Sequence, residues 1–428
     1  MFFASVGFAA GPLPHLDLDM TGAEYARILE KSGPESKSEP ESKSEPESKS
    51  EPESKSEPES ESMILNTLAG DPLDAILTVG RKNLDWLTYI NQSRGEAQKL
   101  SFSTAETQLA YPVEQPKTYN PALIQANYDE LVSALPQEMK AVLLGDAPFT
   151  AGPPIDEAGY LDWGLKLDRA YQNAARWRLM APYLDELARR KANDVRGYYF
   201  FKKVNDLKEK LEHWASLNSE TQARYRSYLI GMCLNNSVSG CAKTVDAQLA
   251  KGAAYKLYQR FLGRSMHLFE SFFNISVKRS DVRWDDRDQS MHVPFVQPTD
   301  IFQQFLSTNI EDEWKWNGWK LLLDFVANAD PNSTPHLVFV PGATPHVNGL
   351  AGNEITMDEN APLTEYNVRW TIRHEYGHVL GFPDCYQEFY DAEQGVMISY
   401  QIDITDLMCS RRGHLKERHH TELRRAYH

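Results

Sequence analysis

The amino-acid sequence predicts an α+β protein in which a mainly helical region precedes a smaller domain of mixed strands and helices. Two patterns predict this class. Between residues 63 and 264, apolar residues recur at three- and four-residue spacing in several long stretches. After about Phe273, short runs rich in β-branched and aromatic residues alternate with helical patterns, as in an α+β domain.

The first 33 residues form a separate segment with the features of a targeting remnant. The start, MFFASVGFAAGPLP, is apolar and contains small residues, but it lacks the positively charged region that opens an export signal. A weak export signal is one interpretation of this segment. A start site misplaced downstream of the true one is the other, and the sequence leaves both open.

Residues 34–62 repeat the motif PESKSE, with a proline every six residues. The repeat has no apolar side chain to bury, so ordering it would cost conformational entropy with nothing to offset the loss. We therefore predict a disordered linker that separates the N-terminal segment from the folded part.

The region 63–264 is predicted to be a helical domain whose role the sequence does not reveal. Its helical stretches include LDAILTVGRKNLDWLTYINQ, NPALIQANYDELVSAL, YLDWGLKLDRAYQNAARWRLM and VNDLKEKLEHWASL. No combination of residues in it indicates catalysis. A scaffold, a prodomain and a module that recruits substrate all remain open.

Residues 265–428 are predicted to form the second domain. The runs FFNISV, MHVPFVQP, PHLVFVPG and GNEITM are typical of strands. A helix is expected from about Thr299 to Asn328, through DEWKWNGWKLLLDFV. The tail GHLKERHHTELRRAY predicts an amphipathic C-terminal helix whose three histidines are expected to be solvated.

Composition and charge exclude several classes of function. The formal net charge of −15 argues against a nucleic-acid partner, because phosphate binding needs a basic face. No apolar run reaches about 18 residues, so no transmembrane segment is expected. The oligomeric state stays open.

The four cysteines bear on the cellular compartment. Cys233 and Cys241 are close enough in sequence for a local disulfide, and Cys385 and Cys409 form the other pair. Two disulfides would favour an oxidising compartment and hence an exported protein, whether secreted, periplasmic or at the cell surface. Four reduced thiols in a cytosolic protein are the alternative.

The segment HEYGHVLGFPDCY, residues 374–386, carries the strongest indication of chemistry. His374 and His378 lie one helical turn apart and so can share one Zn²⁺. Glu375 would face the same site as a general base, for a water whose pKa the metal lowers toward about 7. Gly381 can end the helix and turn the chain, so that Asp384 returns as a third ligand.

Three protein ligands leave a fourth position open, as in a catalytic zinc site, whereas a structural site is closed. The five residues of this pattern would arise together by chance in a chain of this length with a probability on the order of 10⁻⁴. A helix with two salt-bridged surface histidines is the alternative interpretation.

This motif resembles that of the metzincin clan of zinc endopeptidases, and within the clan it looks most like the snapalysin type, in which an aspartate replaces the usual third histidine. The resemblance covers roughly the last 160 residues. It implies a metzincin-like catalytic domain, a twisted mixed sheet with an active-site helix. His374, His378 and Asp384 would hold one catalytic Zn²⁺, Glu375 would be the base, and Tyr386 would orient or stabilise the oxyanion.

The same resemblance implies a methionine turn beneath the metal. Met408, in ITDLMC, is the favoured residue, and Met397 is the alternative. A disulfide between Cys385 and Cys409 would then join the ligand turn to the methionine turn and so support the ligand.

The resemblance further implies that the strand after PHLVFVPGATPHVNGLAG is the sheet edge that pairs with an extended substrate. Gly349 and Gly352 would allow the substrate backbone to approach closely, although both could be ordinary turn residues. The partner expected from the sequence is therefore a protein or peptide substrate.

The sequence thus predicts a zinc-dependent endopeptidase that hydrolyses peptide bonds. Two alternatives remain: a non-catalytic zinc-containing binding or adhesion module, and a latent protease that the helical region holds inactive.

Overall fold

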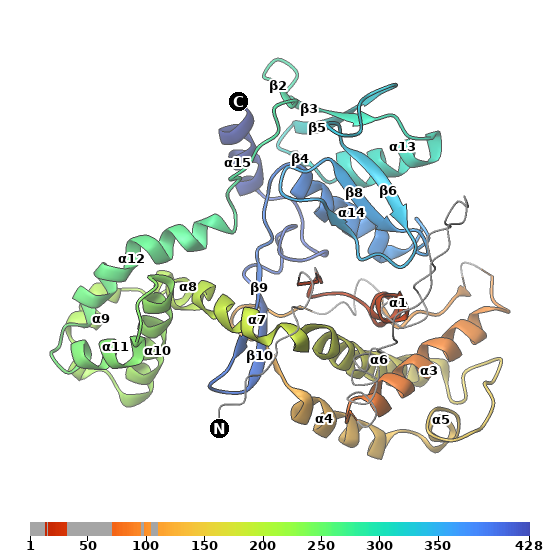
Figure 1. The fold of residues 1–428 in the computed structure, drawn as a ribbon, viewed down its shortest axis with the longest axis horizontal. Coiled ribbons are helices and arrows are strands. Elements are labelled where there is room, and N and C mark those ends of the chain that lie inside the picture. Colours follow the sequence, from red (N-terminus) through yellow and green to blue (C-terminus); the bar gives the residue numbers. More distant parts are fainter. Residues whose placement is uncertain (1–12, 15, 32–70, 96–97, 104–109) are drawn as a thin grey trace, which may run out of the picture. The chain divides into compact units, whose positions relative to one another are not determined.

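The structure is a computed structural model that describes residues 13–14, 16–31, 71–95, 98–103 and 110–428 (Figure 1). The linker predicted over 34–62 lies outside the described residues, as do residues 1–12, 15 and 32–33 of the N-terminal segment. Within the described ranges, no helix has both the length and the apolar character needed to cross a membrane.

The chain divides into two compact units, and neither is continuous in sequence. One unit contains Met1–Asp19, Thr104–Tyr119 and Met180–His428, and the other contains Met20–Ser103 and Asn120–Leu179. The units therefore do not follow the domain boundary expected at residues 264 and 265. Helices that follow Met180 belong to the same unit as the C-terminal strands.

The unit that contains Met20–Ser103 is helical where it is described. Helix α4 begins at residues that favour a helix start. The Asn120 side chain accepts a hydrogen bond from the Leu123 amide, and Pro121 occupies the first turn. The helices are α1 (Gly22–Lys31), α3 (Asp74–Asn91), α4 (Pro121–Ala134), α5 (Gln137–Leu143) and α6 (Glu157–Met180).

The other unit begins its continuous part with a set of helices that share a small core of their own. A Cys233–Cys241 disulfide lies in this core together with Phe201 and Phe261. The helices are η3 (Ala181–Tyr183), α7 (Leu184–Arg190), η4 (Lys191–Asn193), α8 (Arg196–Lys202), α9 (Leu207–Glu212), η5 (Trp214–Ser216), α10 (Ser219–Asn235), α11 (Cys241–Leu249) and α12 (Ala254–Ser271).

Three small sheets and three more helices complete this unit. The sheets have the strand orders β1-β10-β9, β2-β3-β5-β4 and β6-β8-β7. The strands are β1 (Lys117–Tyr119), β2 (Arg283–Asp285), β3 (Ser290–Val296), β4 (Lys315–Trp316), β5 (Trp319–Val326), β6 (His336–Val340), β7 (His346–Val347), β8 (Glu354–Asp358), β9 (Tyr386–Asp391) and β10 (Val396–Gln401). The helices are α13 (Asp300–Leu306), which continues as a π-helix η6 (Ser307–Glu311), α14 (Tyr366–Val379) and α15 (Glu417–Tyr427).

The fold is thus mixed helix and sheet, compatible with the expected α+β class, and the strands expected within MHVPFVQP, PHLVFVPG and GNEITM are present as β3, β6 and β8. The helix expected from Thr299 to Asn328 is wrong beyond its first part. Asn317 and Gly318 have positive φ angles of 47° and 89° and join β4 to β5, with Trp316 opposite Trp319. Asn-Gly favours such a two-residue hairpin turn, and the chain after it becomes a strand.

Two further strand predictions are corrected. FFNISV does not form a strand but a series of turns in which Ile275 is buried. The strand in GNEITM is not a sheet edge, because β8 lies between β6 and β7, and Thr356 pairs with both Val338 and His346. The edge on that side is the short strand β7.

Helix α14 runs through the main core of this unit. Ile372, Tyr376 and Val379 on this helix are fully buried, and they belong to one apolar cluster with Trp314 and Met408. Close packing on all these sides fixes the helix, and with it the side chains that it presents on its remaining face.

Candidate metal centre

Helix α14 and the turn after it bring three metal-ligating side chains together. His374 and His378 follow each other by one turn, and their ring centroids are 4.9 Å apart. The Asp384 Oδ1 atom lies 3.1 Å from His374 Nε2 and 3.3 Å from His378 Nε2. The sequence prediction placed these three residues together, and the structure does so.

The turn that returns Asp384 is formed where α14 ends. The Gly381 amide donates to the His378 carbonyl at 2.9 Å, and the Phe382 amide donates to the Gly377 carbonyl at 3.0 Å. This is the Schellman pattern, which places a residue with positive φ just after the helix. Gly381 has a φ of 91°, and a Cβ there would lie 2.1 Å from the Val277 carbonyl oxygen. Glycine is therefore required at this position both for conformation and for space.

Backbone carbonyls orient both imidazole rings. His374 Nδ1 is 2.9 Å from the Leu407 carbonyl oxygen, and His378 Nδ1 is 2.8 Å from the Phe382 carbonyl oxygen. A carbonyl can only accept, so Nδ1 carries the proton in each ring and Nε2 is turned toward Asp384. Metal-binding histidines in proteins are commonly held in this way by a hydrogen bond on the second nitrogen.

The electrostatic environment of the three residues favours positive charge. Burial alone would lower the pKa of His374, but the hydrogen bond to Asp384 and the charge of Asp17 outweigh it and raise this pKa to about 10. Burial would also lower the pKa of His378, but the charge of Asp384 outweighs burial, so this pKa is raised. The pKa of Asp384 is well below its usual range: partial burial alone would raise it, but the charge of His378 and hydrogen bonds from both rings dominate.

Glu375 lies at the same place with its carboxylate buried. Its side chain has no solvent exposure, and neither of its oxygens has a hydrogen-bond partner among the described residues. A buried carboxylate without partners is costly unless a water, an ion or a substrate group satisfies it. This orphaned carboxylate therefore indicates that a polar group binds beside the histidines.

A zinc ion fits the donor set. Four ligands about 2.0–2.1 Å from Zn²⁺ in a tetrahedron are about 3.3–3.4 Å apart, and the two distances from Asp384 to the imidazoles are 3.1 and 3.3 Å. Two neutral imidazole nitrogens and one carboxylate are also the donors that zinc prefers. A divalent cation would replace the protons that the raised imidazole pKa values attract.

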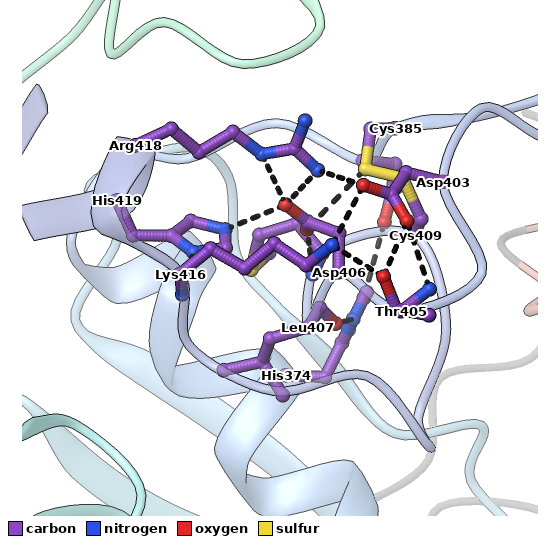
Figure 2. The surroundings of a disulfide bond; sticks show 12 residues. His374, Cys385, Asp403, Thr405, Asp406, Leu407, Cys409, Lys416, Arg418 and His419 are labelled. Atoms are coloured by element: carbon purple, nitrogen blue, oxygen red, sulfur yellow. Dashed lines mark hydrogen bonds and ion pairs between the residues drawn. A yellow bond between two sulfur atoms is a disulfide. The ribbon is translucent and has the colours of Figure 1, made fainter.

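The second disulfide and Asp406 hold the turn beneath His374, His378 and Asp384 in place (Figure 2). Cys385 and Cys409 are bonded, with a Cα–Cα distance of 4.4 Å, so the residue after Asp384 is joined to the residue after Met408. Met408 is buried, and a Cβ on Gly377 would lie 2.2 Å from its sulfur. The Met408 side chain therefore packs against α14 between the two histidines.

Asp406 organises this turn from the inside. Its fully buried carboxylate accepts a hydrogen bond from the Met408 amide at 2.7 Å and pairs with Arg418 and with His419 at 3.1 Å (Figure 2). Although burial acts to raise the pKa of Asp406, the charges of His419 and Arg418 lower it. His419 was expected to be solvated. It is instead buried, because it packs with α15 against this carboxylate. His414 does lie exposed.

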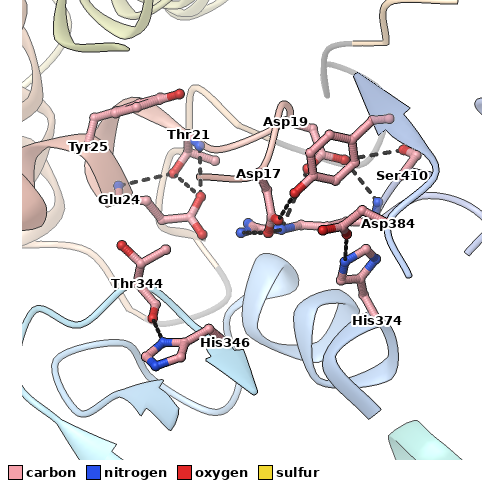
Figure 3. A network of polar contacts seen from close by, with 12 residues as sticks. Asp17, Asp19, Thr21, Glu24, Tyr25, Thr344, His346, His374, Asp384 and Ser410 are labelled. Carbon is pink, nitrogen blue, oxygen red and sulfur yellow. Dashed lines mark hydrogen bonds and ion pairs between the residues drawn. The ribbon is translucent and has the colours of Figure 1, made fainter. Parts of the chain in front are cut away.

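An aspartate from the N-terminal segment reaches the site. The ligand atoms of Asp17, His374 and Glu375 lie within 4.8 Å of one another, and the Tyr386 hydroxyl donates to Asp17 Oδ1 at 3.2 Å (Figure 3). Tyr386 was expected to face the oxyanion of a substrate. In this structure its hydroxyl faces Asp17.

Arg411 holds that aspartate. Its Nε and Nη2 atoms donate to Asp17 Oδ2 at 2.9 and 2.6 Å, and its backbone amide donates to Asp19 Oδ2 at 2.9 Å. Ser410 adds a hydrogen bond to the same Asp19 oxygen at 3.2 Å (Figure 3). Burial raises the pKa of Asp19 and exceeds the opposing effect of Arg411. Sequence reasoning missed all these residues. The alternation Leu-Asp-Leu-Asp at 16–19 was the only local indication.

The remaining predicted residues lie near α14 or further away. Gly349 and Gly352 belong to the loop between β7 and β8, where the Ala351 amide donates to the His378 carbonyl at 2.8 Å. They are turn residues at the end of the helix and not part of an edge strand. Met397, the alternative methionine, lies on β10 opposite Tyr119 and does not form the turn.

No protein-family model, no curated protein and no solved structure matches the chain.

Proposed function

We propose that this protein is a zinc-dependent endopeptidase. The observation that carries the proposal is the convergence of His374 Nε2, His378 Nε2 and the Asp384 carboxylate beside the buried, unpartnered carboxylate of Glu375. The same donors and a neighbouring glutamate are what hydrolysis by a metal-activated water requires.

When bound, Zn²⁺ would polarise the scissile carbonyl and lower the pKa of the attacking water toward about 7. Glu375 then removes a proton from that water as its oxygen attacks the carbonyl carbon. The same carboxyl group delivers the proton to the amine nitrogen as the carbon–nitrogen bond breaks. The Tyr386 hydroxyl, two residues after Asp384, is within reach of this place and would donate to the developing oxyanion once Asp17 is displaced.

The test combines metal analysis with digestion of an unfolded protein. The purified full chain should contain close to one zinc per molecule and should cleave casein, and a chelator or a hydroxamate should stop cleavage. Glu375→Gln should retain the metal and reduce turnover by about 10²- to 10⁴-fold. Glu359→Gln, an exposed carboxylate outside the site, is the matched control and should keep full activity. Undiminished turnover by Glu375→Gln would rule out the proposed role.

One observation favours a second candidate, a non-catalytic module with a structural zinc. The Asp17 carboxylate lies within 4.8 Å of ligand atoms of His374 and Glu375, so it is the residue that would have to move in as a fourth protein ligand, and structural zinc sites are closed by four such ligands. Both candidates bind zinc, so metal content does not distinguish them. Absence of casein cleavage both by the wild type and by Asp17→Asn, with zinc still bound, would favour the module.

The latent-protease alternative takes a different form from the one that the sequence suggested. The acidic residue at the ligands, Asp17, belongs to the N-terminal segment and not to the helical region 63–264. A rise in casein cleavage in Asp17→Asn would therefore assign latency to that segment.

A further inference from the structure

We propose that the region beside His374 and Glu375 contains a subsite for an acidic peptide side chain, that Arg411 recognises this side chain, and that Leu16–Asp19 fills the subsite as an internal ligand. The inference rests on the proposed function and names the substrate class: peptides with a carboxylate side chain next to the bond that is cleaved.

Arg411 is buried and oriented to bind a carboxylate. Its side chain is 1% exposed, and the guanidinium places two nitrogens on one oxygen of Asp17, with Asp19 Oδ1 a further contact at 3.6 Å. A guanidinium presents a rigid set of donors that suits a carboxylate, and it remains charged at all relevant pH values.

The carboxylate that Arg411 binds lies beside the candidate metal centre. Asp17 Oδ2 contacts Arg411 and Asp17 Oδ1 contacts the Tyr386 hydroxyl, while the same side chain lies within 4.8 Å of ligand atoms of His374 and Glu375. A single side-chain carboxylate thus bridges the arginine and the place where a peptide bond would be cleaved. A single residue of a bound peptide can therefore contact Arg411 and lie beside the reacting atoms.

An uncharged occupant would be unfavourable at this position. If a substrate displaced Leu16–Asp19 without supplying a negative charge, the buried guanidinium would lose both aspartates. The loss of two carboxylate partners by a buried charge is unfavourable, whereas a substrate carboxylate would restore the interaction. The site therefore selects an acidic peptide in preference to a neutral peptide of the same shape.

The internal segment has the composition of such a ligand. Asp17 and Asp19 supply the carboxylates, and Leu16 and Leu18 on either side of Asp17 are buried with them. The pairing partners lie far apart in sequence, with a separation of 394 positions between Asp17 and Arg411. A peptide supplied from another molecule can make the same contacts.

The direct test measures binding without turnover. In a Glu375→Gln background, Asp17→Asn and Asp19→Asn weaken the internal ligand, and fluorescence anisotropy then compares two labelled peptides, acetyl-LDLDM-amide and acetyl-LNLNM-amide. Both ends are blocked, so only side-chain carboxylates differ. The acidic peptide should bind at least about tenfold more tightly, and adding Arg411→Gln should remove that preference. Equal affinities, or a preference that survives Arg411→Gln, would overturn the proposal.

A second measurement uses the unaltered protein, in case the multiple variant fails to fold. Hydrogen exchange of the amides at residues 16–20 should rise when excess acetyl-LDLDM-amide is added and should not change with acetyl-LNLNM-amide. Unchanged exchange with both peptides would mean that the segment is a permanent part of the fold, and the subsite would not exist.

These readouts separate the two proposals. If peptide discrimination fails while casein cleavage remains zinc-dependent, the protease stands and the subsite does not. If discrimination holds while no cleavage is found, Arg411 recognises acidic peptides in a protein that is not a protease.

Discussion

The disulfide between Cys385 and Cys409 should support the metal site in a way that the Cys233–Cys241 disulfide does not. Replacing Cys385 and Cys409 together by Ala removes a cross-link between cysteines 24 residues apart, and the chain-entropy relation then gives a loss of about 3.5 kcal/mol in unfolding free energy. The matched control, Cys233→Ala with Cys241→Ala, opens a separation of 8 residues and should cost about 2.6 kcal/mol.

The two losses of stability are similar, but the effects on zinc should differ. Cys385 follows Asp384 directly, and its amide donates to the Met408 carbonyl at 3.0 Å, so its bond to Cys409 fixes the ligand turn against the methionine turn. Loss of such support around a ligand typically weakens metal binding about 10- to 100-fold. The control disulfide lies in the separate helical core and should leave zinc affinity unchanged.

Zinc affinity would be measured by competition with a chromophoric chelator at a temperature where both variants remain folded, and stability by urea unfolding. Equal zinc affinities in the two double variants would refute the reasoning, because they would show that the ligand turn keeps its position without the disulfide.

Three further predictions follow from the same part of the molecule. In the metal-free protein the pKa of His374 is raised from 6.5 to about 10. Its proton therefore stabilises the fold fully below pH 6.5, and this contribution is lost as the pH rises through about 10. Urea unfolding at a series of pH values should show that decline in stability, and saturating zinc should abolish the decline. Gly377→Ala brings a Cβ within 2.2 Å of the Met408 sulfur and should lower the unfolding free energy by about 1–3 kcal/mol. The control Gly263→Ala lies on a helix where no atom is near the added Cβ, and it should cause no loss. Thermal unfolding compares the two variants, and equal transition temperatures would contradict the packing argument. Asp406→Asn removes the carboxylate that pairs with buried His419 and with Arg418, which keeps its pair with Asp403, and should cost about 1–3 kcal/mol in urea unfolding. A loss below about 1 kcal/mol would mean that the turn does not depend on that charge.

The part of the site that the sequence predicted is local in the chain. His374 and His378 are placed by helical periodicity, and Gly381 is placed by the need for a positive φ after the helix, so an 11-residue segment contains most of the geometry. The proposal that Cys385 pairs with Cys409 matches the bond in the structure, since both flank the elements that the resemblance had put together.

The rest depends on contacts that no local pattern encodes. Asp17 meets Arg411 across almost the whole chain, and the alternation of leucine and aspartate at residues 16–19 carries no sign of its partner. The misassigned strand β5 had a local signal that was overlooked: Trp316-Asn317-Gly318-Trp319 is a hairpin turn, but the apolar run after it also fits a helix, because short buried runs do not distinguish the two.

Strand β1 has a practical consequence for anyone who wishes to study the C-terminal part by itself. Lys117–Tyr119 pairs with Met397–Ser399 of β10, and the Tyr119 hydroxyl donates to the buried Glu388 carboxylate at 2.7 Å. A chain shortened to begin near residue 263 would lose this strand, expose one side of β10 and leave the buried Glu388 carboxylate with one hydrogen bond fewer, while Ser399 still donates to it at 2.8 Å. Bare strand edges of that kind attract other chains, so such a fragment is expected to precipitate before its activity can be assayed.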